Sequence, residues 1–169
     1  MTSKLLRLPL FLATVCLFSA PVTPVRAQDA ALAAALKDTT ATFQGGLKAS
    51  EREGTPISAK FEIEDGKLQL SVYTMKGNDF MEVVADPRTG AIAKTEKITA
   101  AEDLKAATLQ KAAMAKAKVP LLAATENAVK ANSGFRAVSI FPELKNGQAT
   151  GEVTVLQGTT FKKVTERLD

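Results

Sequence analysis

The feature that most constrains the fold is an internal repeat with an offset of 81 residues. When Ser71–Gly90 is placed on the C-terminal stretch Glu152–Asp169, identical residues coincide along both stretches. These pairs are Val72 with Val153, Gly77 with Gly158, Phe80 with Phe161 and Val83 with Val164. The turn pair Asp65-Gly66 falls on Asn146-Gly147 at the same offset. The repeat predicts one helix–strand–strand–strand unit used twice.

The first copy shows the hydrophobic pattern of a helix followed by strands. A helix is predicted from about Thr42, with Phe43, Leu47 and Ser50 on one side and Gly54 as its terminator. Residues 56–65 then alternate as a strand with one buried and one solvated face. The apolar face is predicted to carry Ile57, Ala59, Phe61 and Ile63, and the solvated face Ser58, Lys60, Glu62 and Glu64.

Further strands are predicted from Leu68 and over Phe80–Ala85, and 91–98 reads as a short strand or a covering segment. The connection between the copies reads as a helix over 100–118, opened by a Thr99/Glu102 capping box. Its larger apolar residues are Leu104, Leu109 and Met114. A second helix begins at Pro120 and ends at Ser133-Gly134. Strands over 135–144, 151–156 and 161–168 follow.

The expected fold class is therefore α+β, with two helix-plus-antiparallel-sheet (α-β-β-β) units joined by a linker helix. The expected boundaries are a signal peptide at 1–27, an Ala-rich and loosely helical arm at 28–41, a first unit at 42–98, the linker helix at 99–118 and a second unit at 119–169.

The N-terminus has the three-part pattern of a secretory signal peptide. Lys4 and Arg7 precede an apolar run over 8–20, and Val25-Arg26-Ala27 offers small residues at the positions that signal peptidase reads. Cleavage is predicted between Ala27 and Gln28. The run is shorter than the roughly 20 residues of a spanning helix, and Cys16 lies inside it rather than at a lipidation site. A periplasmic or secreted protein with no membrane span in the mature chain is expected.

Removing the predicted leader changes the charge balance. The leader contains Lys4, Arg7 and Arg26 and no acidic residue, so the 22 basic residues fall to 19 against 18 acidic ones. The electrostatic case for nucleic acid therefore disappears. The single Cys also leaves with the leader, and the chain has no His.

The missing residue types argue against catalysis. Without His or Cys the mature chain cannot form a Ser-His-Asp or Cys-His arrangement, nor the usual zinc or copper ligand sets. No cofactor or metal is expected. A Ser-Lys pair, Ser58 with Lys60, is the nearest nucleophile candidate, but alternation places both side chains on a solvated strand face.

Carboxylates, methionines and strand edges are the remaining candidates. Glycoside chemistry would need a pair among Glu62, Glu64, Asp79 and Glu82 across an aromatic-lined cleft, and few aromatic residues are present. Residues 86–90 lack the repeated oxygens of a calcium loop. Met75, Met81 and Met114 could be a soft copper site, but core filling is expected. Open strand edges can bind extended peptides.

The chain resembles the PepSY family. The resemblance is carried by LKASEREGTPISAKFEIEDG (47–66) and LQLSVYTMKGNDFMEVVADPRTGAI (68–92), above all by a strand ending in Asp86, Thr89 and Gly90. Residues 121–169 resemble the same pattern without that ending. The resemblance implies a small helix-on-sheet α+β unit, found in propeptides of secreted metallopeptidases and in exported bacterial proteins. Peptidase inhibition is the function usually proposed, and no family catalytic residue is implied.

Two functions are expected from these observations. The first is an exported, non-catalytic binding module that restrains a secreted or periplasmic peptidase, or binds another envelope protein, through a strand edge or the cleft between the copies. The alternative is a small-ligand or envelope-stress sensor without enzymatic activity. A hydrolase using carboxylates or Ser-Lys is the third reading and has the least support.

Overall fold

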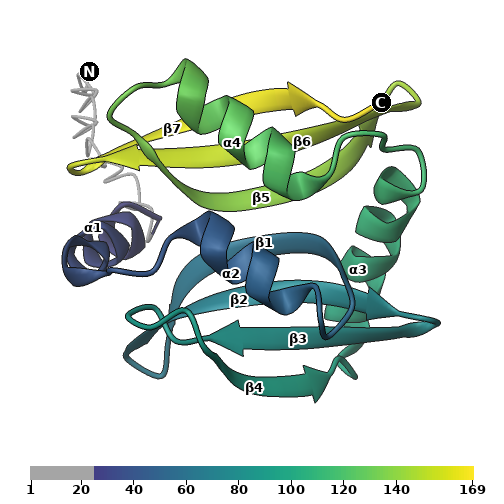
Figure 1. The fold of residues 1–169 in the computed structure, drawn as a ribbon, viewed down its shortest axis with the longest axis horizontal. Helices are drawn as coiled ribbons and strands as arrows, with labels where there is room; N and C mark the ends of the chain where they lie inside the picture. Colours follow the sequence, from purple (N-terminus) through teal and green to yellow (C-terminus); the bar gives the residue numbers. More distant parts are fainter. Residues whose placement is uncertain (1–24) are drawn as a thin grey trace, which may run out of the picture.

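The computed structural model describes residues 25–169, so residues 1–24 of the expected leader lie outside the described part. Seven antiparallel strands form one sheet in the order β4-β3-β2-β1-β5-β6-β7 (Figure 1). The strands are β1 (Thr55–Glu64), β2 (Lys67–Lys76), β3 (Asp79–Ala85), β4 (Ile92–Lys97), β5 (Arg136–Lys145), β6 (Gln148–Gln157) and β7 (Thr160–Arg167). The helices are α1 (Val25–Ala35), α2 (Phe43–Ser50), α3 (Ala101–Met114) and α4 (Leu121–Ala131), with a 3-10 turn η1 (Leu36–Asp38). The expected α+β class is confirmed.

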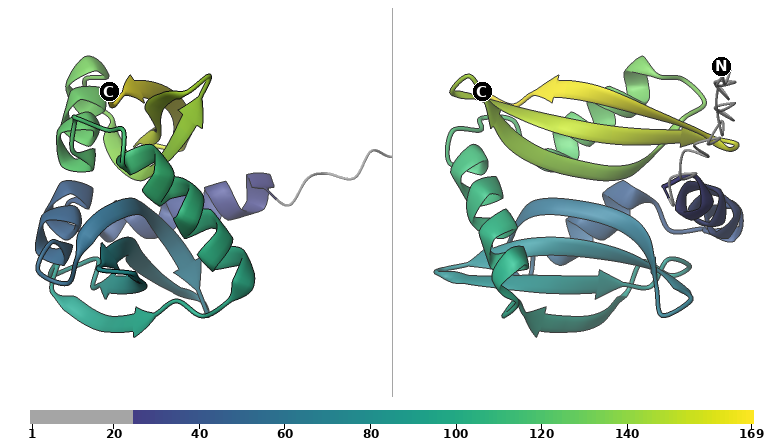
Figure 2. Two further views of the ribbon diagram at one scale, coloured as in Figure 1. Left: turned by 90° about the vertical axis from the view of Figure 1, so that its right-hand side faces the viewer. Right: turned by 180° about the vertical axis from the view of Figure 1, so that it is seen from behind.

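Two layers of helix enclose the sheet. Helices α2 and α4 lie on one face, and α3 crosses the opposite face (Figure 2). The main core fills the space under α2 and α4 and draws on both halves of the chain, from Phe43 and Leu70 to Val153 and Leu168. A second, smaller cluster lies under α3 and comprises Ile57, Phe80, Ile98 and Ala107.

The two halves of the sheet join through a very short ladder. Only Ala59–Ile140 and Lys60–Ser139 pair between β1 and β5. Ala59 therefore faces the residue 81 positions further along, as it would across a two-fold axis between equivalent strands. Both strands also shift register beside this ladder, β1 between Pro56 and Ser58 and β5 between Ala137 and Ser139. The strands separate on either side, because a bulge bends its strand.

The local geometry of the two halves follows the same offset. Asp65 and Asn146 both take positive φ, 49° and 52°, in the two-residue turns that close the β1–β2 and β5–β6 hairpins. Asx-Gly is the sequence that such turns favour, because both positions need φ above zero. The predicted hairpins are thus confirmed at both places.

Helix α2 is confirmed from its cap to its buried face. Thr42 Oγ1 accepts a hydrogen bond from the Gly45 N–H at 2.9 Å, which satisfies one of the free donors of the first turn. Phe43, Leu47 and Ser50 are buried as predicted. Gly46 is also buried, and a Cβ at this position would lie 2.1 Å from Leu70 Cδ2. The glycine that lowers helix propensity therefore lets α2 approach β2 closely.

The predicted solvated face of β1 is wrong at its first residues. Ser58 is fully buried, and its hydroxyl donates to Gln110 Oε1 of α3 at 2.7 Å. Ile57 packs in the cluster under α3 rather than with Ala59 and Phe61. The bulge between Pro56 and Ser58 explains Ile57, because the extra residue interrupts the alternation there. Ser58 keeps the same face as Lys60 and is buried because α3 covers it.

Three helical predictions are also corrected. The arm at 28–41 is not loose: Ala33 and Leu36 are buried in the main core, and Arg136 donates to the Leu36 carbonyl at 3.0 Å. Helix α3 starts at Ala101 with Ala100 as its N-cap and no side-chain cap, so the Thr99/Glu102 capping box does not form. The connecting helix ends at Met114 instead of Lys118. Within it, Leu109 is 64% exposed.

Among residues 25–169, no helix has the length and apolar character needed to cross a membrane.

Candidate functional site

A groove of about 620 Å³ lies where the two halves meet, between the end of α2, the β2–β3 turn, the end of α3 and the start of α4. We call it the inter-half groove. Its walls carry the apolar residues Leu47, Met75, Met114, Leu121 and Leu122 and the charged residues Glu51, Arg52 and Lys76. The three charged residues are exposed, whereas Leu47 and Leu121 are buried. The groove thus has an apolar floor and a charged rim.

The wall of the groove that belongs to the second half is fixed by the chain terminus. The N–H groups of Lys118 and Val119 both donate to the Leu168 carbonyl, at 2.6 and 2.8 Å. Pro120 then serves as the N-cap of α4, so Leu121 and Leu122 enter the groove in the first turn of that helix. The rim is held by surface ion pairs, Lys48 with Glu51 at 2.6 Å and Arg52 with Glu53 at 3.3 Å.

The chemistry of the groove suits binding more than reaction. An apolar pocket with a few polar groups at its margin is the usual form of a ligand site. None of its lining residues is a serine, cysteine or histidine; its hydroxyl and amine groups are those of Thr55 and Lys76. Glu51 and Arg52 already have charged partners on the rim. The arrangement can hold an apolar group and orient it by charge.

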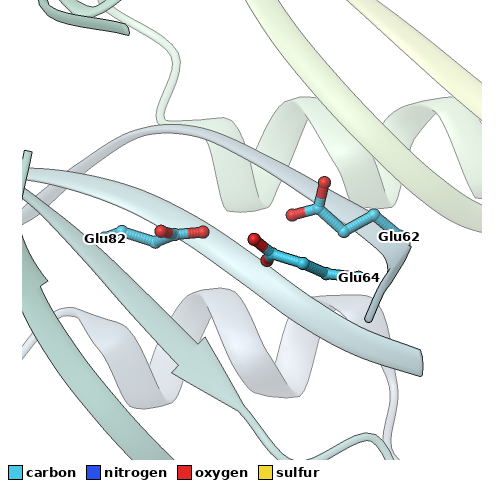
Figure 3. Close-up of side chains that lie close together, drawn as sticks. All are labelled: Glu62, Glu64 and Glu82. Carbon is cyan, nitrogen blue, oxygen red and sulfur yellow. The ribbon is translucent and has the colours of Figure 1, made fainter. Parts of the chain in front are cut away.

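The candidate carboxylates come together only in part (Figure 3). Glu62, Glu64 and Glu82 each place a carboxylate oxygen within 4.8 Å of the others on the α3 side of the sheet. Asp79, the fourth candidate, instead pairs with Lys97 at 2.6 Å. The cluster is engaged by its neighbours, because Lys60 Nζ lies 2.5 Å from Glu62 and Gln69 Nε2 donates to Glu64 at 2.6 Å. We assign no metal or catalytic site to it.

Burial and charge shift the titration of this face. Burial raises the pKa of Glu82, and the charges of Glu62 and Glu64 raise it further, against a hydrogen bond from Ser71 and the charge of Lys60. Burial also raises the pKa of Tyr73 to about 12, while Lys60 opposes that rise. Although burial acts to lower it, the pKa of Lys60 is raised by its hydrogen bond to Glu62 and by nearby negative charge. Lys60 is therefore a cation and not a base.

The other predicted sites form only in part. Ser58 and Lys60 share a strand face, but the Ser58 hydroxyl donates to Gln110 Oε1 of α3 and Lys60 Nζ pairs with Glu62, so the two are not bonded to each other. Met75 and Met114 both line the inter-half groove. Met81 lies across from Thr74, on the opposite face of the sheet from Met75. Met81 is thus separated by the sheet from the other two methionines, so the predicted three-methionine site is not brought together.

The turn that carries the family resemblance has a structural task. Asp86 Oδ1 accepts hydrogen bonds from the Arg88 N–H, the Thr89 N–H and the Thr89 hydroxyl, and Gly90 takes φ of 73°. These three bonds lower the pKa of Asp86. The turn also binds the segment before α2, because the Ala41 N–H donates to the Pro87 carbonyl at 3.1 Å and the Thr40 hydroxyl to the Arg88 carbonyl. The turn links β3 to β4 and is hydrogen-bonded to the segment that precedes α2.

The predicted cleavage pair lies in α1, where Ala27 and Gln28 are both exposed. Together with Phe61, Glu62 and Ile63 they line a hollow of about 530 Å³ beside β1. Cleavage itself stays a prediction.

The groove residues were not found from the sequence. Glu51, Arg52 and Lys76 lie beside predicted helix and turn ends, and Leu122 is one of several apolar residues of α4. The repeat alone could have suggested that α2 and α4 lie together, but nothing in the pattern indicates where they leave space. Comparison with models of known protein families, with curated proteins and with solved structures found no match.

Proposed function

We propose that the chain is an exported, non-catalytic binding module built from two PepSY-like units. In this proposal the units span 42–98 and 119–169, and the inter-half groove holds an extended segment of a secreted or periplasmic peptidase or of another envelope protein. The observation that carries it is the groove of about 620 Å³ at the junction of the two halves, which has an apolar floor and a charged rim.

Duplication supports the two-unit reading. Equivalent bulges, equivalent Asx-Gly turns and the pairing of Ala59 with its equivalent Ile140 all follow the 81-residue offset. Each half also carries a helix before its strands, α2 in the first and α4 in the second. Asp86, Thr89 and Gly90 support the family resemblance through the closed turn that they form.

The test places a charge in the groove floor. Leu122 is half-buried in the first turn of α4 and lines the groove. Leu122→Asp should therefore abolish capture of an envelope partner and any inhibition of peptidase activity in envelope extracts. Leu109→Asp is the matched control, because Leu109 is exposed on α3 and does not line the groove. Lys76→Glu on the rim tests the same site without touching the core.

Two results would count against the proposal. The first is a purified protein that inhibits no peptidase and captures no envelope protein. The second is equal loss of binding in Leu122→Asp and Leu109→Asp, since only the former lies in the groove. Circular dichroism of each variant separates lost binding from lost folding.

A small-ligand or envelope-stress sensor is the second candidate. A volume of about 620 Å³ falls in the range of small-molecule pockets, roughly 300–1,000 Å³. An apolar floor near Arg52 and Lys76 favours an apolar anion. Anilinonaphthalene sulfonate should fluoresce on binding to the wild-type protein and to Leu109→Asp but not to Leu122→Asp. An apolar anion that fails to raise the Tm of the protein would remove the support for this function.

A further inference from the structure

Among residues 25–169, one edge of β7 is unpaired, and here the two halves differ. In the first half, β3 has β2 on one side and β4 on the other. At the 81-residue offset β3 corresponds to β7, which pairs with β6 on one side only among residues 25–169. Figure 1 shows β4 and β7 at opposite ends of the sheet. The equivalent of the β3 edge that receives β4 is therefore unpaired in the second half.

The hydrogen-bonding groups on this edge can be assigned from the hairpin. Gln157 and Thr160 flank the two-residue turn between β6 and β7. The residues that flank such a turn exchange hydrogen bonds, and bonded and non-bonded pairs then alternate along the strands. Backbone N–H and C=O groups of Phe161, Lys163, Thr165 and Arg167 consequently point away from β6. These groups form the template for another strand.

We infer that a second copy of this chain pairs with β7 through its own β7, antiparallel, about a two-fold axis at Val164. The chain already contains such a junction within itself, because Ala59 of β1 pairs antiparallel with its equivalent Ile140 of β5. A closed two-fold dimer uses the same surface on both copies. The two sheets then become one continuous sheet.

Charge selects the register. A two-fold axis perpendicular to the sheet pairs only residues whose side chains lie on the same face of the sheet. One residue of β7 must therefore lie opposite its own copy, and the axis passes between these two residues. An axis at Lys163 sets that residue against its own copy, and an axis at Thr165 sets Lys163 against Arg167. With the axis at Val164, Lys162 faces Glu166 of the other copy and Lys163 faces Thr165. Opposite charges facing each other across strands stabilise pairing and like charges oppose it.

The side chains on β7 are placed for this register. Val164 packs against the main core and pairs with Val153 of β6, which is buried under α4. Lys162 reaches Asn132 Oδ1 at the end of α4 at 2.6 Å, which holds its ammonium group on that face. Its two other N–H donors are free to reach a carboxylate. Glu166 is partly buried on the same strand face, two positions beyond Val164.

The edge of β4 differs from that of β7 in the charges it leaves available. Both strands are mostly exposed and neither has a buried residue. On β4, Lys94 pairs with Glu96 of the same strand at 2.7 Å and Lys97 with Asp79 at 2.6 Å. On β7, Lys163 and Arg167 are likewise engaged, with Glu152 at 2.6 Å and Asp169 at 2.8 Å, but Lys162 and Glu166 form no ion pair within residues 25–169. We therefore use β4 as the control edge.

The test is a charge swap in which sedimentation equilibrium measures the dimer dissociation constant. The protein is expressed with residues 1–169 and purified in the form that the cell produces from them. Lys162→Glu and Glu166→Lys should each raise the dimer dissociation constant at least tenfold, because each sets two like pairs across the axis. The double variant should restore association. So should an equimolar mixture of the two single variants, in which every pair is again opposite in charge.

Restored association in the double variant cannot come from an ion pair within one chain, because residues 162 and 166 lie about 13 Å apart along an extended strand. Lys94→Glu on β4 should leave the dissociation constant unchanged. Thr165→Pro removes an outward N–H without touching the β6 ladder, so it should also abolish the dimer while far-UV circular dichroism stays unchanged.

A wild-type protein that remains monomeric at millimolar concentration overturns the inference. So does a dimer that survives both single substitutions, or single variants whose mixture fails to associate. A dimer that responds to Lys94→Glu and not to Lys162→Glu would place the interface at β4 and would equally overturn it.

Discussion

At the scale of single residues, the ionised carboxylate of Glu82 on the acidic face of the first half should lower the free energy of unfolding. Glu82 is partly buried beside Glu62 and Glu64, and its pKa is raised by burial first and by those charges second. A carboxyl whose pKa is raised on folding binds its proton more tightly in the folded protein. Its contribution therefore favours folding at low pH and is lost as the pH rises from its ordinary value of 4.5.

Glu82→Gln is expected to raise the Tm by a few degrees at pH 7, with the gain shrinking as the pH approaches 4. Glutamine keeps an acceptor for the Ser71 hydroxyl but carries no charge. Thermal unfolding at several pH values measures the effect. Glu143→Gln is the control, because Glu143 is paired with Lys145 at 2.6 Å and its neutralisation should not stabilise. A Tm difference for Glu82→Gln that does not change with pH would contradict this assignment.

At the scale of elements, the contact between α2 and β2 depends on a missing side chain. Gly46→Ala adds a Cβ only 2.1 Å from Leu70 Cδ2, and Leu70 is 1% exposed, so its side chain has little room to move. Overpacking of this kind typically costs about 1–3 kcal/mol. Alanine favours a helix over glycine by about 1 kcal/mol. Packing should exceed propensity, and the net result should be a loss of stability.

Chemical denaturation of Gly46→Ala, Leu70→Val and the double variant tests this contact. The double variant should lose less than the sum of the two single losses, because the smaller valine frees the space that the new methyl group needs. Additive losses would show that the two side chains do not meet.

Elements whose signals are local could be predicted from the sequence, and elements set by distant contacts could not. The hairpins at Asp65-Gly66 and Asn146-Gly147 and the helix after Thr42 are encoded by a few adjacent residues. Ser58 is buried because α3 packs over it, and its hydrogen-bond partner Gln110 lies 52 positions away in the sequence. The β1–β5 ladder and the inter-half groove arise only when both halves are packed. The Thr99/Glu102 pattern matched a capping box, yet the helix begins two residues after Thr99.

At the scale of the whole molecule, the main core makes the halves one cooperative body. It contains Phe43 and Leu47 of the first half together with Val155 and Leu168 of the second. Helices α2 and α4 are in contact over the sheet. Because the same buried cluster supports both hairpins, neither half should unfold while the other stays native.

The single tyrosine makes this testable. Tyr73 lies in the first half and the chain has no tryptophan, so tyrosine fluorescence reports that half while far-UV circular dichroism reports both. Leu47→Ala and Leu168→Ala should each cost about 2–5 kcal/mol and shift both signals to the same midpoint. A fluorescence midpoint that stays in place in Leu168→Ala would mean that the halves unfold separately.

Both hairpin turns close on an exposed Asx-Gly pair, and this chemistry bears on how the protein ages. Aspartate and asparagine before glycine are prone to cyclise to a succinimide, which reopens mainly to isoaspartate; asparagine is among the residues that thermostable proteins tend to avoid. Isoaspartate lengthens the backbone by one methylene, and a turn of altered length cannot keep the register that it sets. Long storage in warm buffer should therefore damage the molecule at two matching points, at Asn146 in mildly alkaline buffer and at Asp65 in mildly acidic buffer, where its carboxyl group is partly protonated.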